Sequence, residues 1–173
     1  MGYAPEGMTH RITLERNTLR FAAAHFTASS SECEPLHGHN YDVFVEIEGD
    51  LTPESWVIDF GSAKRIAREI CGGLDHRFIA ASRSTATRIT AAAGEITIDA
   101  AGKRYVMPGG DVALLDIDNT TAERLAEWFA GQLAERLATL GAVNLRRITV
   151  GVEEMPGQAG WFVLDYPLAS GSC

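Results

Sequence analysis

The 173-residue sequence predicts a single α+β domain, in which two amphipathic helices cover one face of a mostly antiparallel sheet. Two patterns support this class. Residues 41–48 alternate apolar and polar side chains, which is typical of a half-buried strand in an antiparallel sheet. Residues 62–71 and 120–141 repeat apolar side chains at helical spacing. Strand-like segments around the helices supply the rest of the sheet, and the length suits one domain, 1–173.

Two strand regions precede the first helix. Residues 9–26 are strand-like apart from an expected turn at Arg16–Asn17, and residues 41–49 alternate cleanly. The polar, serine-rich segment 27–35 between them is expected to be a loop. Because residues two apart on a strand share a face, His25 is expected on the apolar face of the first region.

The first helix is predicted from residue 62 onward. Ser62 is a suitable N-cap, and apolar side chains follow at i, i+3, i+4, i+7 and i+8. Asp59, three positions earlier, is an alternative cap for the same helix. Gly72–Gly73 is expected to end the helix, because glycine is common at helix C-termini.

Residues of about 80–112 form a distinct piece of the chain and are predicted to be an inserted β-hairpin. Residues 95–99 and 103–107 carry strand patterns on both sides of a turn at 100–102. Residues 112–117 then return to the body of the domain.

The second helix is the stronger of the two in the sequence. Thr120 and Glu123 form a capping-box pattern, an apolar stripe follows, and Gly141 is expected to stop the helix. Residues 147–154 and 160–166 then predict two final strands.

Composition narrows the class of function. A formal net charge of −8 argues against non-specific nucleic-acid binding. The three cysteines, Cys33, Cys71 and Cys173, are too few and too scattered for a disulfide scaffold, which fits a reducing cytoplasm. No apolar run approaches the ~20 residues of a membrane span, so we expect a soluble cytoplasmic protein with no membrane partner.

Three histidines are candidate metal ligands. His37 and His39 lie two apart at a strand entry, so both side chains can point the same way, and His25 lies on an earlier strand that can pair alongside. Three neutral imidazoles with an open fourth position are the layout of a catalytic zinc site. The alternative is ordinary loop histidines near the surface.

The loop and the helix end carry further reactive side chains. Near a cation the thiol of Cys33 would ionise more easily and could serve as a base; the alternative is an inert loop cysteine. Glu34 is a second candidate for the base, and its alternative is a carboxylate exposed to solvent. Asp75 can orient His76, or the two make routine hydrogen bonds after the helix. Glu154, at a strand end, can bind a guanidine-like edge or is a solvated acid.

Together, these segments resemble the 6-pyruvoyltetrahydropterin synthase / 6-carboxytetrahydropterin synthase family. The matching motifs are Phe21-x-Ala-Ala-His25, Cys33-x-x-x-His37-Gly-His39-Asn-Tyr41, Asp59-Phe60, Leu74-Asp75-His76, Thr121-Ala-Glu123 and Val152-x-Glu154. The resemblance covers nearly the whole chain outside 80–112. It implies a tunnelling fold (T-fold), a four-stranded antiparallel sheet with two helices on one face. It also implies a homohexamer, a dimer of trimers with active sites between subunits.

The resemblance also implies roles for individual residues. The zinc ligands fall on His25, His37 and His39. The catalytic cysteine falls on Cys33, the aspartate–histidine pair on Asp75 and His76, and the pterin-anchoring glutamate on Glu154.

The reaction that this resemblance implies is a lyase reaction on 7,8-dihydroneopterin triphosphate. The favoured product is 6-carboxy-5,6,7,8-tetrahydropterin, formed with release of triphosphate and acetaldehyde, in queuosine biosynthesis. One alternative is the pyruvoyl product. Another is cleavage of the substrate side chain to a 6-hydroxymethyl pterin, a precursor of folate. One branch of the family performs this cleavage with a glutamate in the loop that corresponds to Cys33 and Glu34. A third alternative, of a different class, is a non-catalytic pterin-binding hexamer.

Overall fold

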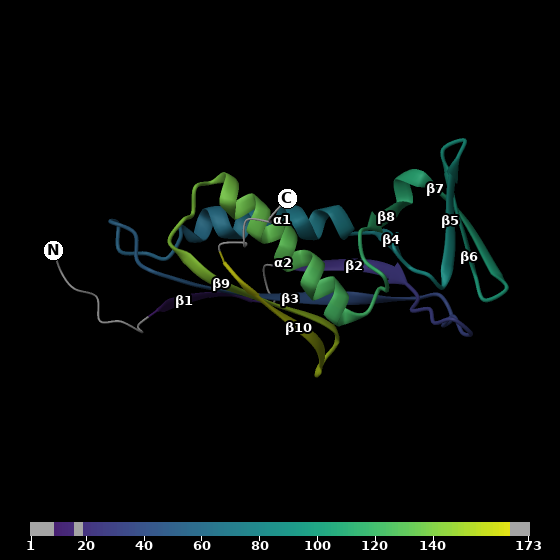
Figure 1. Ribbon diagram of the computed structural model, residues 1–173, viewed down its shortest axis with the longest axis horizontal. Helices are drawn as coiled ribbons and strands as arrows, with labels where there is room; N and C mark the ends of the chain where they lie inside the picture. Colours follow the sequence, from purple (N-terminus) through teal and green to yellow (C-terminus); the bar gives the residue numbers. More distant parts are fainter. Residues whose placement is uncertain (1–8, 16–18, 167–173) are drawn as a thin grey trace.

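The structure is a computed structural model that describes residues 9–15 and 19–166, so the expected turn at Arg16–Asn17 and the cysteine at 173 lie outside it. Two helices lie side by side over one face of a long, twisted sheet (Figure 1). A small three-stranded sheet stands at one end of the molecule (Figure 1). The predicted α+β class is therefore confirmed.

The main sheet has the order β10-β9-β3-β2-β4-β8 in the described residues, with β1 also paired to β3. Its strands are β1 (His10–Leu14), β2 (Arg20–His25), β3 (His37–Gly49), β4 (Arg77–Ala81), β8 (Val112–Leu115), β9 (Leu145–Met155) and β10 (Gln158–Asp165). The strands β2, β3, β9 and β10 are antiparallel neighbours, as predicted. The sheet continues past β2 through β4 and β8, which run parallel to it.

The long strand β3 organises the N-terminal half of the sheet. Its first half pairs with β2 and its second half with β1, so the two earlier strands lie end to end along it. The register places His25 directly opposite His37. The alternation predicted for 41–48 is confirmed: Tyr41, Val43 and the next two odd-numbered residues are fully buried under the helices.

Helix α1 (Phe60–Leu74) begins and ends at residues other than those predicted. Its N-cap is Asp59, whose carboxylate accepts a 2.7 Å hydrogen bond from the backbone amide of Ser62. The alternative cap Asp59 is therefore confirmed, and the prediction of Ser62 as cap was wrong. The helix also continues through Gly72–Gly73, where it was predicted to end. Glycine can adopt the backbone angles of a helix end, but it can also adopt helical ones. It ends where His76 adopts a left-handed backbone with φ of 57° and the chain turns into β4.

Helix α2 (Ala122–Thr139) is capped by Thr121, whose hydroxyl accepts from the amide of Arg124. The predicted cap, Thr120, is instead buried, and its hydroxyl donates to the carbonyl of Phe26 across 2.8 Å. Gly141, with φ of 73°, follows the helix end as expected. No helix in the described part of the chain is long and apolar enough to cross a membrane.

The insertion is larger than the predicted hairpin. The hairpin itself is present as β6 (Glu95–Ala100) and β7 (Lys103–Pro108), and β5 (Thr87–Ala92) adds a third antiparallel strand. A short 3-10 helix, Gly109–Asp111, leads back to β8. The insertion packs on the helix-free face of the main sheet. There Phe78 and Ala80 of β4 join its apolar cluster, whereas Ile79 joins the helix-side core.

Candidate metal centre and active site

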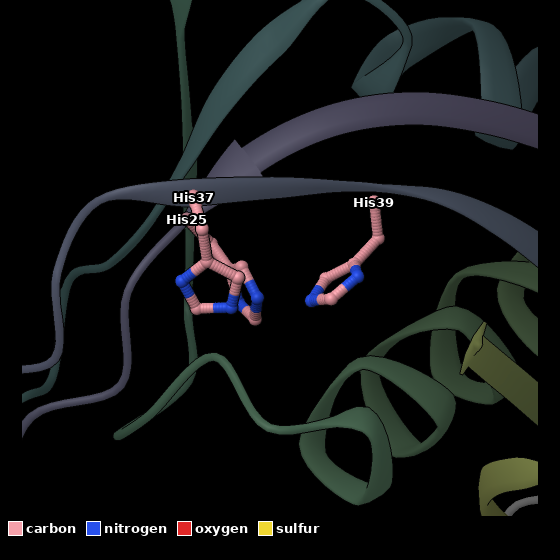
Figure 2. Close-up of side chains that lie close together, drawn as sticks. All are labelled: His25, His37 and His39. Atoms are coloured by element: carbon pink, nitrogen blue, oxygen red, sulfur yellow. The ribbon is translucent and has the colours of Figure 1, made fainter.

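Three histidine rings converge on the helix side of the sheet (Figure 2). His25 comes from the end of β2 and His37 and His39 from the start of β3, and one nitrogen atom of each lies within 4.8 Å of the others. The ring centroids are 4.6 to 5.3 Å apart. The β2–β3 register explains the cluster, because His39 lies opposite Ala23 and therefore on the same face as the His25–His37 pair.

Backbone carbonyls fix the proton on two of these rings. Nδ1 of His25 lies 3.0 Å from the carbonyl oxygen of Thr120, and Nδ1 of His37 lies 2.9 Å from that of Pro35. A carbonyl oxygen can only accept, so in both rings Nδ1 carries the hydrogen and Nε2 presents a lone pair. Nε2 of His25 is buried without a hydrogen-bond partner. This is the arrangement that orients histidine ligands in metal sites, so the residues present fit a metal ion.

Burial lowers the pKa of two of these imidazoles, those of His25 and His39. It lowers the pKa of His25 from 6.5 to about 4, with the neighbouring His37 and His39 adding to the shift and the Thr120 carbonyl opposing it. Burial, followed by the charge of His37, also lowers the pKa of His39. Neutral imidazole is the form that binds metal ions, so His25 is ready to bind at neutral pH.

The histidines line a cavity of about 570 Å³ beside the first turn of α2. Its lining residues are His25, Thr27, Glu34, His37, His39, Thr121, Ala122, Glu123, Glu154, Gln158, Ala159 and Gly160. We call it the histidine pocket. Glu154 lies where predicted, with Oε1 3.9 Å from Nε2 of His25, and burial raises the pKa of its carboxyl group. The neighbouring Glu153 points elsewhere and accepts a hydrogen bond from the amide of Gly157.

The two loop candidates for a base face different surroundings. Glu34 lines the histidine pocket, and its carboxylate accepts a 3.2 Å hydrogen bond from the amide of Thr27. Hydrogen bonding to Thr27, first to its side chain and then to its amide, lowers the pKa of Glu34. The thiol of Cys33 is not among the pocket's lining groups. It packs against the apolar cluster of the insertion and donates to the carbonyl of Glu34 across 3.4 Å.

Asp75 and His76 form the pair that the sequence suggested, but outside the histidine pocket. Nδ1 of His76 lies 2.8 Å from Asp75 Oδ2, and the other carboxylate oxygen accepts from the amide of Ala22. That amide hydrogen bond is the largest cause of the lowered pKa of Asp75. His76 lines a second cavity of about 580 Å³, whose lining includes Ala22 and Asn40 on the helix-free face of the sheet and which also touches His39.

Some contributors to the site carry no sequence signal. The carbonyl of Thr120 orients His25, yet any residue type can supply a carbonyl. Gln158, the first residue of β10, lines the pocket, and Lys103 of the insertion contacts the loop that carries Cys33. Each meets residues that are distant in the sequence.

Comparison with known proteins agrees with this geometry. The family described as 6-pyruvoyl tetrahydropterin synthase matches residues 13–163. A protein of Methanocaldococcus jannaschii, provisionally assigned as a 6-carboxy-5,6,7,8-tetrahydropterin synthase, is 36% identical over 145 residues, which is 83% of this chain and 89% of that protein. A Pyrococcus horikoshii protein with the same provisional name is 34% identical over 155 residues, covering 86% of this chain and 90% of its own.

Solved structures show the same fold. The 6-pyruvoyltetrahydropterin synthase of Plasmodium vivax superposes with a TM-score of 0.84 at 28% identity, over 91% of this chain and 99% of that one. A variant of the same protein, in which a glutamate described as a catalytic residue is replaced by alanine, gives 0.85 at 27% identity and the same coverage. The fold of this chain is therefore the T-fold of these structures.

Proposed function

Because the chain belongs to the 6-pyruvoyl tetrahydropterin synthase family, we propose that it is a zinc-dependent 6-carboxytetrahydropterin synthase. In this proposal a cytoplasmic lyase converts 7,8-dihydroneopterin triphosphate to 6-carboxy-5,6,7,8-tetrahydropterin, releases triphosphate and acetaldehyde, and serves queuosine synthesis. The names of the M. jannaschii and P. horikoshii relatives support this product. The observation that carries the proposal is the convergence of three imidazoles, two of them oriented by backbone carbonyls, in a pocket that also holds carboxylates.

We assign the metal site to His25, His37 and His39. Three neutral nitrogen ligands leave a fourth position open, which is typical of catalytic rather than structural zinc. A zinc ion bound there supplies Lewis acidity toward side-chain oxygens of the substrate, which acidifies the adjacent C–H bonds.

Glu154 is assigned to the pterin ring. A carboxylate can accept two parallel hydrogen bonds from the guanidine-like edge of a pterin. Its place in the histidine pocket, beside His25, supports this role, because it would hold the ring with the substrate side chain directed to the histidines.

The proton acceptor is assigned to the loop of Cys33 and Glu34. The family resemblance gives the role to Cys33, whereas the lining of the pocket favours Glu34. The P. vivax protein, in which a glutamate is described as catalytic, supports the second assignment. A carboxylate held by the Thr27 amide is ionised at neutral pH and can accept a proton from a bound substrate.

Asp75 and His76 are assigned to proton relay in the site of a neighbouring subunit. Within one protomer the pair lies in the second cavity, so it needs another copy of the chain to meet a histidine pocket. This fits a homohexamer of two trimers with active sites between subunits, as the resemblance implies.

A second candidate function is side-chain cleavage to a 6-hydroxymethyl pterin, a folate precursor. The observation that favours it is Glu34, rather than Cys33, in the histidine pocket. The structural likeness to the P. vivax 6-pyruvoyltetrahydropterin synthase supports the pyruvoyl compound as a further alternative product.

The deciding experiment is incubation of the zinc-loaded protein with 7,8-dihydroneopterin triphosphate, with the products identified by mass spectrometry. Release of acetaldehyde together with 6-carboxy-5,6,7,8-tetrahydropterin is expected. A 6-hydroxymethyl or pyruvoyl product would redirect the assignment to that branch. Pterin binding with no turnover by a metal-replete sample would support the non-catalytic pterin-binding hexamer instead.

A further inference from the structure

One side chain of the insertion, Lys103, makes hydrogen bonds to the loop that carries the candidate base. Lys103 is the first residue of β7, directly after the turn of the β6–β7 hairpin. Its Nζ atom donates to the carbonyl oxygen of Cys33 across 2.7 Å and to that of Glu34 across 2.9 Å. One ammonium group therefore binds two consecutive carbonyls of the loop.

This double contact constrains the loop backbone. In an extended strand, successive residues face opposite ways, and so do their carbonyl groups. Two consecutive carbonyls can reach one nitrogen atom only if Glu34, the residue between them, departs from the extended form. The backbone angles of a residue set the direction of its Cβ atom, so this conformation bears on where the Glu34 side chain points.

Apolar packing fixes the position of the lysine. The ring of Tyr105, two residues further along β7, stacks on Phe26 at a centroid distance of 5.2 Å. The thiol of Cys33 packs against the same cluster, which includes the fully buried Ile98 of β6. Ala101, in the hairpin turn, lines a cavity of about 590 Å³ together with the loop. The insertion is therefore anchored on both sides of Lys103.

We propose that Lys103 is a positioning residue that holds Glu34 toward the histidine pocket and keeps Cys33 against the insertion. Through Lys103, the insertion thus fixes which of the two loop side chains faces the histidine pocket and can accept the proton. This inference rests on the proposed function, because it assumes that a proton acceptor in this loop is needed.

Chemical labelling tests the positioning without any turnover. Lys103→Met removes the ammonium group and keeps the length of the side chain, and the matched control is Arg104→Met on the exposed face of the same strand. We expect iodoacetamide to modify Cys33 several-fold faster in Lys103→Met than in the wild type, as measured by peptide mapping. The buried Cys71 serves as the internal standard. Equal rates of modification in Lys103→Met, Arg104→Met and wild type would overturn the proposal.

Turnover gives the second readout. Lys103→Met should lower kcat by about tenfold or more, as for a displaced catalytic group, while KM and zinc content stay near wild-type values. Lys103→Arg, which can still donate to both carbonyls, should recover most of the activity. If Lys103→Met does not fold, Lys103→Gln replaces it in both measurements. An unchanged kcat, or a loss of activity that Lys103→Arg does not restore, would contradict the positioning role of Lys103.

The two readouts separate this proposal from the proposed function. If the wild type shows no turnover, the proposed function fails, and the labelling rates still decide whether Lys103 holds the loop. If the wild type turns over and Glu34→Gln is fully active, the assignment of Glu34 fails irrespective of Lys103.

Discussion

Cys33 and Glu34 are neighbours in the chain and both line the cavity beside Ala101, yet of the two only Glu34 also lines the histidine pocket, whereas Cys33 packs against the insertion. Proton transfer in this loop should therefore depend on the carboxylate more than on the thiol.

We predict that Glu34→Gln lowers kcat by about 10²- to 10⁴-fold, the usual contribution of a general base. Cys33→Ala is expected to cost less, and both variants should retain their zinc. Steady-state kinetics with metal analysis of each sample checks this. A large loss in Cys33→Ala beside a small loss in Glu34→Gln would return the role to Cys33, as the resemblance implies.

Metal content should depend on the three convergent histidines. We expect His37→Ala to lose most of its zinc, because two ligands remain and the open positions are filled by water. Asn40→Ala, on the same strand but on the lining of the second cavity, is the matched control. Atomic absorption of dialysed protein measures both. Full zinc content in His37→Ala would exclude it as a ligand.

The stability of the metal-free protein should fall in acid because of His25. Its folded pKa of about 4 lies below the ordinary value of 6.5, so below pH 6.5 the unfolded chain binds a proton that the folded protein excludes. The free energy of unfolding is therefore fully retained above pH 6.5. It should decrease toward pH 4 by on the order of 3 kcal/mol from this residue.

Urea denaturation of the metal-free wild type and of His25→Gln between pH 7 and 4.5 measures the contribution of His25 to the free energy of unfolding. The variant should lose less stability over that interval, since its side chain does not titrate. Parallel pH dependence in the two proteins would show that His25 titrates normally in the fold.

Gly160 should not tolerate a side chain. A Cβ atom there would overlap the backbone of Ala122 and Glu123 at the start of α2. We expect Gly160→Ala to lower the free energy of unfolding by about 1–3 kcal/mol, as for overpacking of a close contact. Gly131→Ala within α2, where a Cβ meets nothing within 4 Å, should instead stabilise by about 0.5–1 kcal/mol. Chemical denaturation of both variants tests this contrast.

Much of the fold follows from local patterns. The strand around Tyr41 and the helix around Ile70 each bury one face, so the apolar positions in the sequence pattern are the buried positions in the structure. The strand β4 has no such pattern, because Phe78 and the three residues after it are buried on both faces. Helix ends were less predictable, since several nearby residues could have capped each helix: of the two candidates for α1 the cap is Asp59 and not Ser62, and in α2 Thr121 replaced the expected Thr120.

The sequence by itself determined the three candidate ligands, His25, His37 and His39, and their common face, because two-residue periodicity on a strand fixes side-chain direction. The tertiary structure decided the remainder. It placed the carbonyl of Thr120 on His25 and turned Glu34 rather than Cys33 toward the pocket. Directions of loop side chains depend on backbone angles, and no local pattern encodes contacts with distant segments such as the hydrogen bonds from Lys103 to this loop.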